Sequence, residues 1–137
     1  RSHVILVPYF TTLVRGIASS LLFGPLAIAG FLVAGLGDAI GEPVGARFGK
    51  HRYRVFSREA VPATRSFEGS AAVCLASAFA LALAVAASPQ LALGPFGWVK
   101  IAAIAIISAL TEAVSPHGWD NATMQVVPTA LAWLWLV

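Results

Sequence analysis

Asp38 and Glu42 are two carboxylates four residues apart in an otherwise apolar part of the chain. At the centre of a bilayer each carboxylate costs about 2.5–3.5 kcal/mol, so the pair belongs at a membrane surface or in a wet, protein-lined pocket. On one helix, residues at this spacing share a face, where they could hold one divalent cation. Magnesium suits such a site because it takes few protein carboxylates and completes its shell with phosphate oxygens and water. The pair therefore predicts a metal site for a charged ligand.

Glycines recur every four residues beside this pair, at Gly37, Gly41, Gly45 and Gly49. Two interpretations are open: small residues at this interval allow close helix packing in a membrane, and bare backbone lets a phosphate chain approach. Pro43 is expected to kink or end the helix near Glu42, because proline lacks the N–H that a helix needs. A broken helix of this kind would line a cavity.

Two further polar clusters interrupt the apolar sequence. In Arg65–Ser70, Ser66 can cap the helix that follows, and Glu68 suits the positive end of its dipole. The alternative is that this cluster binds a charged ligand. The third cluster runs from Glu112 to Asn121, where Asp120 or Asn121 is a plausible helix cap. These clusters supply the remaining candidates for a site.

The composition is that of a membrane protein. The 137 residues are 58% hydrophobic and 11% charged, with a mean hydropathy of +0.82, whereas soluble domains are about 25% charged. Because about 20 apolar residues cross a bilayer, we expect spans at 16–37, 67–88, 96–115 and 122–137, with Val4–Val14 a shorter apolar piece of undecided role. The predicted fold class is all-α, a polytopic transmembrane helical bundle. Residues 1–137 would form a single integral-membrane domain, a fragment of a longer bundle.

Charge is unevenly distributed along the chain. Six of the nine basic residues lie in one 19-residue segment, 47–65, which predicts a cytoplasmic loop by the positive-inside rule and accounts for the net charge without a nucleic-acid partner. All six acidic residues lie in the loops expected on that side, about 38–68 and 112–121, and the opposite loop 88–95 has no charge. Since the rule does not segregate carboxylates, this asymmetry predicts a polar site for a charged ligand at the cytoplasmic face. The expected location is a bacterial inner membrane.

Three short motifs follow one another in order, and their residues are Gly37-Asp38-Ala39 with Phe48-Gly49-Lys50-His51, Arg65-Ser66-Phe67-Glu68-Gly69-Ser70, and Glu112-Ala113 with Asp120-Asn121. Together they resemble the CTP-dependent lipid kinases of membranes, namely phytol, farnesol and dolichol kinases and the CTP-using diacylglycerol kinase. Phosphatidate cytidylyltransferases are similar over the first two motifs. The Asp-Asn ending of the third motif favours the kinases, because the cytidylyltransferases carry a Lys-Asp pair there.

The resemblance implies a kinase that transfers a phosphoryl group from CTP to a membrane lipid alcohol, with Mg²⁺ as cofactor. The implied metal ligands are Asp38, Asp120 and Glu42. The implied nucleotide-binding residues are Gly41, Gly45, Lys50, Arg65, Ser66 and Asn121. The family commonly has lysine at the position of Arg65, and arginine keeps the positive charge while offering a fork to phosphate.

Catalytic roles are also implied by the resemblance. Glu112 would take the proton of the alcohol as a general base, since it ends a span at the depth where a lipid hydroxyl arrives. Glu68 would orient ligands or side chains, and Asp120 would act through the metal. Phosphoryl transfer depends mainly on such positioning and charge neutralisation.

Two alternatives stay open at this point. One is a cytidylyltransferase that makes CDP-diacylglycerol from phosphatidate and CTP. The other is a non-enzymatic transporter or assembly subunit, for which carboxylates spread through the spans would be typical. The expected partners are a membrane lipid substrate and CTP, without nucleic acid, and self-association into a homo-oligomer is left open.

Overall fold

The computed structural model describes residues 2–55, 63–115 and 120–137. In these ranges the chain is helical except for connecting segments and one short hairpin, so the all-α expectation is confirmed. The helices are α1 (Ser2–Phe23), α2 (Ala27–Phe48), α3 (Phe67–Ala87), α4 (Gly97–Val114) and α5 (Asp120–Leu136), with a single 3₁₀ turn, η1 (Gly24–Leu26), between the first two. The strands are β1 (Arg52–Val55) and β2 (Ala63–Ser66).

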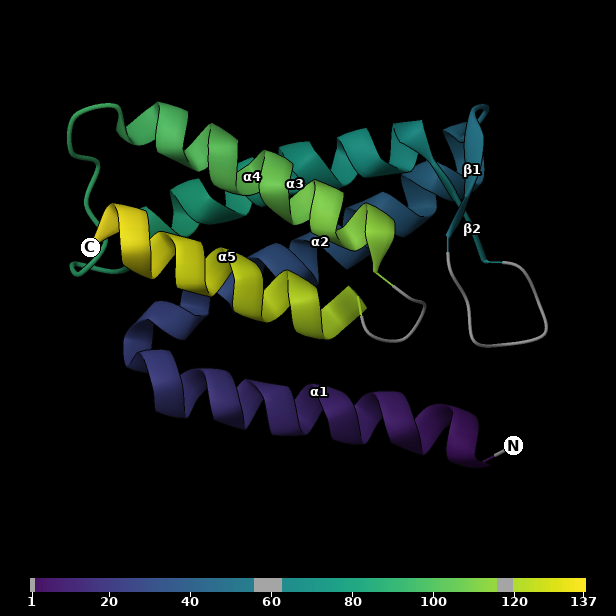
Figure 1. Ribbon diagram of the computed structural model, residues 1–137, viewed down its shortest axis with the longest axis horizontal. Helices are drawn as coiled ribbons and strands as arrows, with labels where there is room; N and C mark the ends of the chain where they lie inside the picture. The colour runs from purple at the N-terminus through teal and green to yellow at the C-terminus, as the bar shows by residue number, and fades with distance from the viewer. Residues whose placement is uncertain (1, 56–62, 116–119) are drawn as a thin grey trace.

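The first apolar stretch is divided between two helices, so the expectation of one span over 16–37 was wrong. The chain turns at Gly24, whose φ of 54° lies in the left-handed region and which begins the 3₁₀ turn, with Pro25 as the second residue of that turn. Glycine accepts this backbone conformation without strain, and proline is suited to the start of a helical turn. Helix α1 therefore runs one way and α2 returns beside it (Figure 1). Val4–Val14, whose role was undecided, is part of α1.

Pro43 was expected to kink or end the helix near Glu42, and the expectation of an end was wrong, because α2 continues through Pro43 to Phe48. Proline inside a helix removes one hydrogen bond to the carbonyl four residues earlier. The close packing of α2 against α3 on both sides of this position favours the continued helix. As a result Asp38 and Glu42 lie within a long helix, and not in a loop that follows a span.

Glycines on α2 allow close contact with its neighbours. A Cβ atom on Gly41 would overlap the side chain of Val73 in α3, and one on Gly30 would overlap the backbone of Gln125 in α5. The helix-packing interpretation of the glycines is thus confirmed. The largest fully buried side chains at the centre of the bundle come from α2, α3, α4 and α5, and they are Val33, Leu81, Ile104, Met124 and Thr129.

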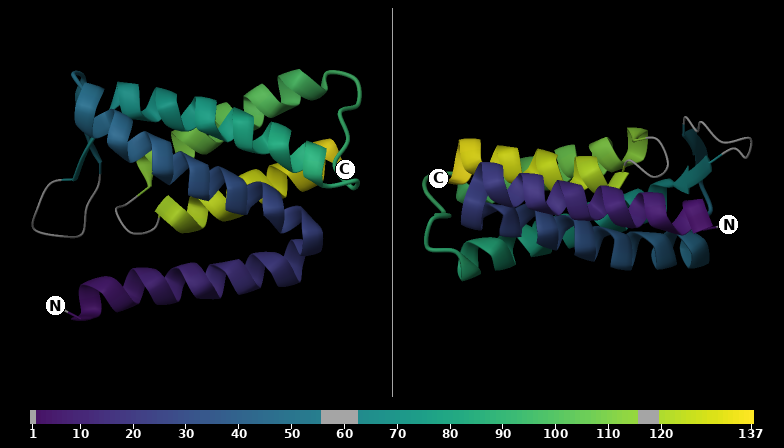
Figure 2. Two further views of the ribbon diagram at one scale, coloured as in Figure 1. Left: turned by 180° about the vertical axis from the view of Figure 1, so that it is seen from behind. Right: turned by 90° about the horizontal axis from the view of Figure 1, so that it is seen from below.

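Polar segments far apart in the sequence meet at one end of the bundle. The end of α2, the hairpin, the start of α3, the end of α4 and the start of α5 lie together, and the segment between α3 and α4 lies at the opposite end (Figures 1 and 2). The described parts of the segments 38–68 and 112–121 therefore lie at one end of the bundle, as expected. In the described part of the chain, three stretches are long and apolar enough to cross a membrane by length and composition: Thr12–Phe48, which includes the turn between α1 and α2, Phe67–Ala87 and Gly97–Val114.

The basic segment 47–65 contains an antiparallel hairpin that the sequence reasoning treated as a loop. Its register pairs Arg52 with Ser66, Tyr53 with Arg65 and Arg54 with Thr64. The hairpin fixes the position of these residues relative to the start of α3.

Candidate active site

A cavity of about 450 Å³ lies at the polar end of the bundle. This volume is within the range of small-molecule sites, about 300–1,000 Å³. Four parts of the fold line it, namely α2, the hairpin, the first two turns of α3 and the end of α4. The lining residues are Gly37, Asp38, Gly41, Glu42, Gly45, Ala46, Arg52, Thr64, Arg65, Ser66, Gly69, Ser70, Val73 and Glu112.

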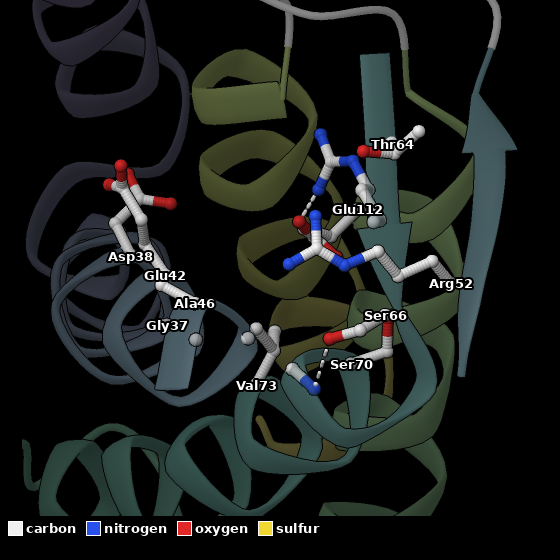
Figure 3. A pocket seen from close by; sticks show the side chains of 14 residues that line it. Gly37, Asp38, Glu42, Ala46, Arg52, Thr64, Ser66, Ser70, Val73 and Glu112 are labelled. Carbon is white, nitrogen blue, oxygen red and sulfur yellow. Dashed lines mark hydrogen bonds and ion pairs between the residues drawn. The ribbon is translucent and has the colours of Figure 1, made fainter. Parts of the chain in front are cut away.

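The α2 side of the cavity carries the two carboxylates first singled out in the sequence. Asp38 and Glu42 project in the same direction from one face of α2 (Figure 3), as their four-residue spacing requires. Both are exposed. The pair therefore presents carboxylate oxygens to one region of the cavity, which is the ligand type that Mg²⁺ prefers.

Bare backbone forms much of the wall between α2 and α3. Gly41, Gly45 and Gly69 line the cavity, and a Cβ atom on Gly69 would come 3.2 Å from the Cα atom of Gly45 and 3.3 Å from the carbonyl oxygen of Gly41. These glycines serve helix packing and also border the cavity without a side chain. The two interpretations of the glycine repeat are therefore compatible.

Arg65 and Glu112 form an ion pair on the other side of the cavity, between β2 and the last turn of α4 (Figure 3). Their side chains are only 15% and 14% exposed. Removing one member of a poorly solvated ion pair leaves the other charge uncompensated, so each residue constrains the other. The predicted general base and a predicted phosphate ligand are thus direct partners in this structure.

Ser66 caps α3, as one of the two interpretations predicted. Its hydroxyl oxygen accepts a hydrogen bond of 3.1 Å from the backbone N–H of Gly69, and the residue is buried. The N-terminal turn of a helix offers backbone N–H groups and a positive dipole end, both of which favour anions. Because Ser66, Gly69 and Ser70 all border the cavity, this favourable end faces the site.

Glu68 and Lys50 lie outside the cavity lining, in contrast to the other described candidates. The Nδ1 atom of His51 is 2.7 Å from a carboxylate oxygen of Glu68, and the backbone N–H of His51 lies 3.3 Å from both oxygens. The backbone N–H of Phe67 also donates to the carbonyl of His51 over 3.0 Å. These bonds join the residue before β1 to the start of α3. Lys50 is exposed beside them.

Arg52 and Thr64 also line the cavity but were not predicted as site residues, and Ser70 was predicted only as a member of the Arg65–Ser70 cluster. Arg52 extends into the cavity from β1 (Figure 3). The hydroxyl of Tyr53, next in the chain, is 2.7 Å from that of Ser70. For Arg52, the signal that could have identified it is the alternation Arg52-Tyr53-Arg54-Val55, since alternating polar and apolar residues are typical of a strand with two different faces.

The third motif is only partly described. Asp120 and Asn121 begin α5 at the same end of the bundle as the cavity, but their side chains, like residues 116–119, lie outside the described part of the chain. Among the described residues, no group of three or more His, Cys, Asp or Glu side chains has a metal-binding arrangement. The proposed metal set of Asp38, Glu42 and Asp120 therefore stays a prediction.

Comparison with known proteins gives one informative similarity. The chain is 35% identical over 114 residues to phytol kinase from Synechocystis sp. (strain ATCC 27184 / PCC 6803 / Kazusa), an alignment that covers 80% of this chain and 46% of the relative. This chain thus spans about half the length of that protein. No protein-family model and no solved structure matches. The similarity supports the kinase side of the resemblance and does not show a relation to cytidylyltransferases, and with the apolar helices it indicates a membrane protein.

Proposed function

We propose that this chain carries the phosphoryl-transfer site of a CTP-dependent lipid-alcohol kinase, with an isoprenoid alcohol such as phytol, farnesol or dolichol, or diacylglycerol, as acceptor. The observation that carries the proposal is the cavity that brings Asp38 and Glu42 together with Arg52 and Arg65 at the polar end of apolar helices. Phosphoryl transfer needs groups of both signs, since metal ions and cations neutralise phosphate oxygens while carboxylates hold the metal. Similarity to a phytol kinase supports the class of acceptor.

The α2 carboxylates fit a magnesium ion. Mg²⁺ is typically bound through one or two carboxylates together with substrate phosphates and water, and Asp38 and Glu42 supply two carboxylates on one face of α2. When bound, the ion would neutralise charge on the phosphate oxygens. Asp120 is proposed as a further ligand from α5. Asn121 is proposed to contact the nucleotide from the same turn.

The cationic side would hold the phosphate chain of CTP. Arg52 and Arg65 approach from the two strands of the hairpin, and a guanidinium can bind two phosphate oxygens at once. Gly41, Gly45 and the first turn of α3, with Ser66 as its cap, offer bare backbone and N–H groups beside them. Lys50, outside the lining, is proposed to contact the nucleotide where it leaves the cavity.

The Arg65–Glu112 ion pair links nucleotide binding to proton transfer. A phosphate group that takes the guanidinium of Arg65 would release the carboxylate of Glu112 inside the cavity. The acceptor alcohol oxygen would then attack the γ-phosphorus of CTP, and its proton would pass to Glu112. The bond between the γ-phosphorus and the β,γ-bridging oxygen breaks, and CDP leaves with the electron pair. Glu68 would act indirectly, by holding the hairpin to α3 through His51.

A product assay tests this proposal. The protein in phosphatidylcholine nanodiscs is incubated with Mg²⁺, CTP labelled at the γ-phosphate, and phytol, farnesol, dolichol or diacylglycerol in turn. We expect CDP and a labelled lipid monophosphate from at least one alcohol, and no lipid monophosphate with ATP in place of CTP. Release of pyrophosphate from CTP with phosphatidate as acceptor would instead establish a cytidylyltransferase. The absence of any nucleotide turnover would support a non-enzymatic role.

A further inference from the structure

A second cavity, of about 640 Å³, lies between the hairpin, α3 and α4. Most of its lining is apolar, and the principal side chains are Phe67, Ala71 and Cys74 of α3 and Ile106, Leu110 and Val114 of α4. Its polar lining residues, Tyr53, Arg54 and Ser70, come from β1 and from the second turn of α3. We call this second cavity the apolar groove. Its polar groups are therefore concentrated at the hairpin end of an otherwise apolar surface.

Among the described residues, one belongs to the lining of both the apolar groove and the polar cavity. Ser70 lines both. Its hydroxyl oxygen lies 2.7 Å from that of Tyr53, a residue of the groove lining. Tyr53 is held in turn against the ring of Phe67, with 5.0 Å between ring centroids. A pair of hydroxyl groups thus stands where the charged and apolar compartments meet.

The groove is open on the outer surface of the bundle. Phe67, Leu110 and Val114 are 64%, 61% and 72% exposed, and they belong to helices that are long and apolar enough to cross a membrane. Exposed apolar surface of this kind favours a hydrocarbon occupant over a polar solute. An amphiphile that arrives from the lipid could keep its chain in the groove and place its polar end at the hairpin.

We propose that the apolar groove binds the hydrocarbon chain of the acceptor alcohol and that the Tyr53–Ser70 pair positions its hydroxyl toward the polar cavity. This assignment rests on the proposed function, because it names where that reaction's acceptor lies. Two observations support this assignment: Ser70 borders both cavities, and the groove has its polar groups at one end of an apolar surface, as an amphiphile does. Tyr53 and Ser70 are positioning residues, which hydrogen-bond the hydroxyl before it attacks.

Cys74, the one cysteine in the sequence, is a probe already present in the groove. The protein in phosphatidylcholine nanodiscs, without nucleotide, is treated with N-ethylmaleimide and the labelled fraction is followed by mass spectrometry. We expect phytol to slow labelling at least several-fold, and butan-1-ol at the same concentration to leave it unchanged. The hydrocarbon phytane should protect less than phytol, because it cannot bond to the hydroxyl pair. Equal protection by phytane would overturn the role of Tyr53 and Ser70, and no protection by phytol would overturn the groove assignment.

A kinetic test gives an independent answer. Ala71→Trp fills the groove from an exposed position on α3, and the control Ala86→Trp places the same side chain at the far end of that helix. We expect Ala71→Trp to raise KM for phytol about tenfold or more while KM for CTP stays near that of the parent protein, and Ala86→Trp to change neither. An unchanged KM for phytol in Ala71→Trp would refute the inference. If no variant phosphorylates any alcohol, the proposed function fails, whereas protection of Cys74 still reports on the groove.

Discussion

The contact between α2 and α3 at Gly41 can be tested with a matched pair of glycine substitutions. Gly35 and Gly41 are both in α2, but a Cβ atom on Gly35 would meet nothing within 4 Å, whereas one on Gly41 would overlap Val73. Replacing a helical glycine with alanine gains about 1 kcal/mol from backbone propensity at either position. At position 41 the new methyl group would crowd Val73, and overpacking of this kind costs about 1–3 kcal/mol. Val73 cannot move away easily, because the rotamer of a valine side chain is restricted in a helix. The difference between Gly35→Ala and Gly41→Ala should therefore equal the overpacking cost.

The measurement is the free energy of unfolding in mixed micelles, followed by the helical circular dichroism signal as the mole fraction of dodecyl sulfate rises. We expect Gly35→Ala to be more stable than the parent protein and Gly41→Ala to be about 1–3 kcal/mol less stable than Gly35→Ala. Val73→Ala removes the methyl groups that a Cβ atom at position 41 would overlap. In this background Gly41→Ala should no longer carry the overpacking cost, and a double-mutant cycle measures the difference. Equal stabilisation by both glycine substitutions would show that α2 and α3 do not approach as closely as described.

Three further predictions concern charge. Asp38→Asn keeps the size of the side chain but removes the charge that a hard cation requires, so turnover of CTP should fall about 10²-fold or more, and near-normal activity would remove this residue from the metal site. Arg65→Gln should lower the free energy of unfolding by about 1–3 kcal/mol, because it leaves the carboxylate of its ion-pair partner uncompensated, and Arg65→Lys should recover most of that loss; equal losses in both variants would show that the charge is not responsible. In a Cys74→Ser background, Arg54→Cys should react with an impermeant thiol reagent only from the cytoplasmic side and Gln90→Cys only from the opposite side, so labelling of both from one side would refute the topology.

Hydropathy and charge were enough to predict the helical bundle and the end at which polar groups gather, because both properties depend on many residues at once. The helix boundaries depended on single residues. Apolar sequence continues without interruption across Gly24 and Pro25, so the turn between α1 and α2 leaves no trace in the hydropathy. Similarly, Pro43 predicted a kink or an end of the helix, and the helix continues through it.

The candidate site was predicted better in its composition than in its contacts. Asp38, Glu42, Arg65 and Glu112 do line one cavity, but no sequence pattern indicated that Arg65 and Glu112, 47 residues apart, would form an ion pair. The contribution of Arg52 was missed because the hairpin was not recognised, and strand pairing is what carries it into the cavity. Sequence spacing relates residues within one helix, whereas these relations arise between elements and require the packed structure.

The glycines that line the polar cavity limit how its size can be changed by substitution. Four lining positions are occupied by glycine, namely Gly37, Gly41, Gly45 and Gly69. A glycine has no side chain to shorten, so the cavity cannot be widened at these positions, and every replacement there narrows it. To accept a bulkier phosphate donor at the proposed site, a longer side chain elsewhere in the lining, for example Thr64, would have to be replaced by a shorter one. The apolar groove has the reverse property, since Ile106 and Leu110 can both be shortened, and its occupant could be changed without altering the polar cavity.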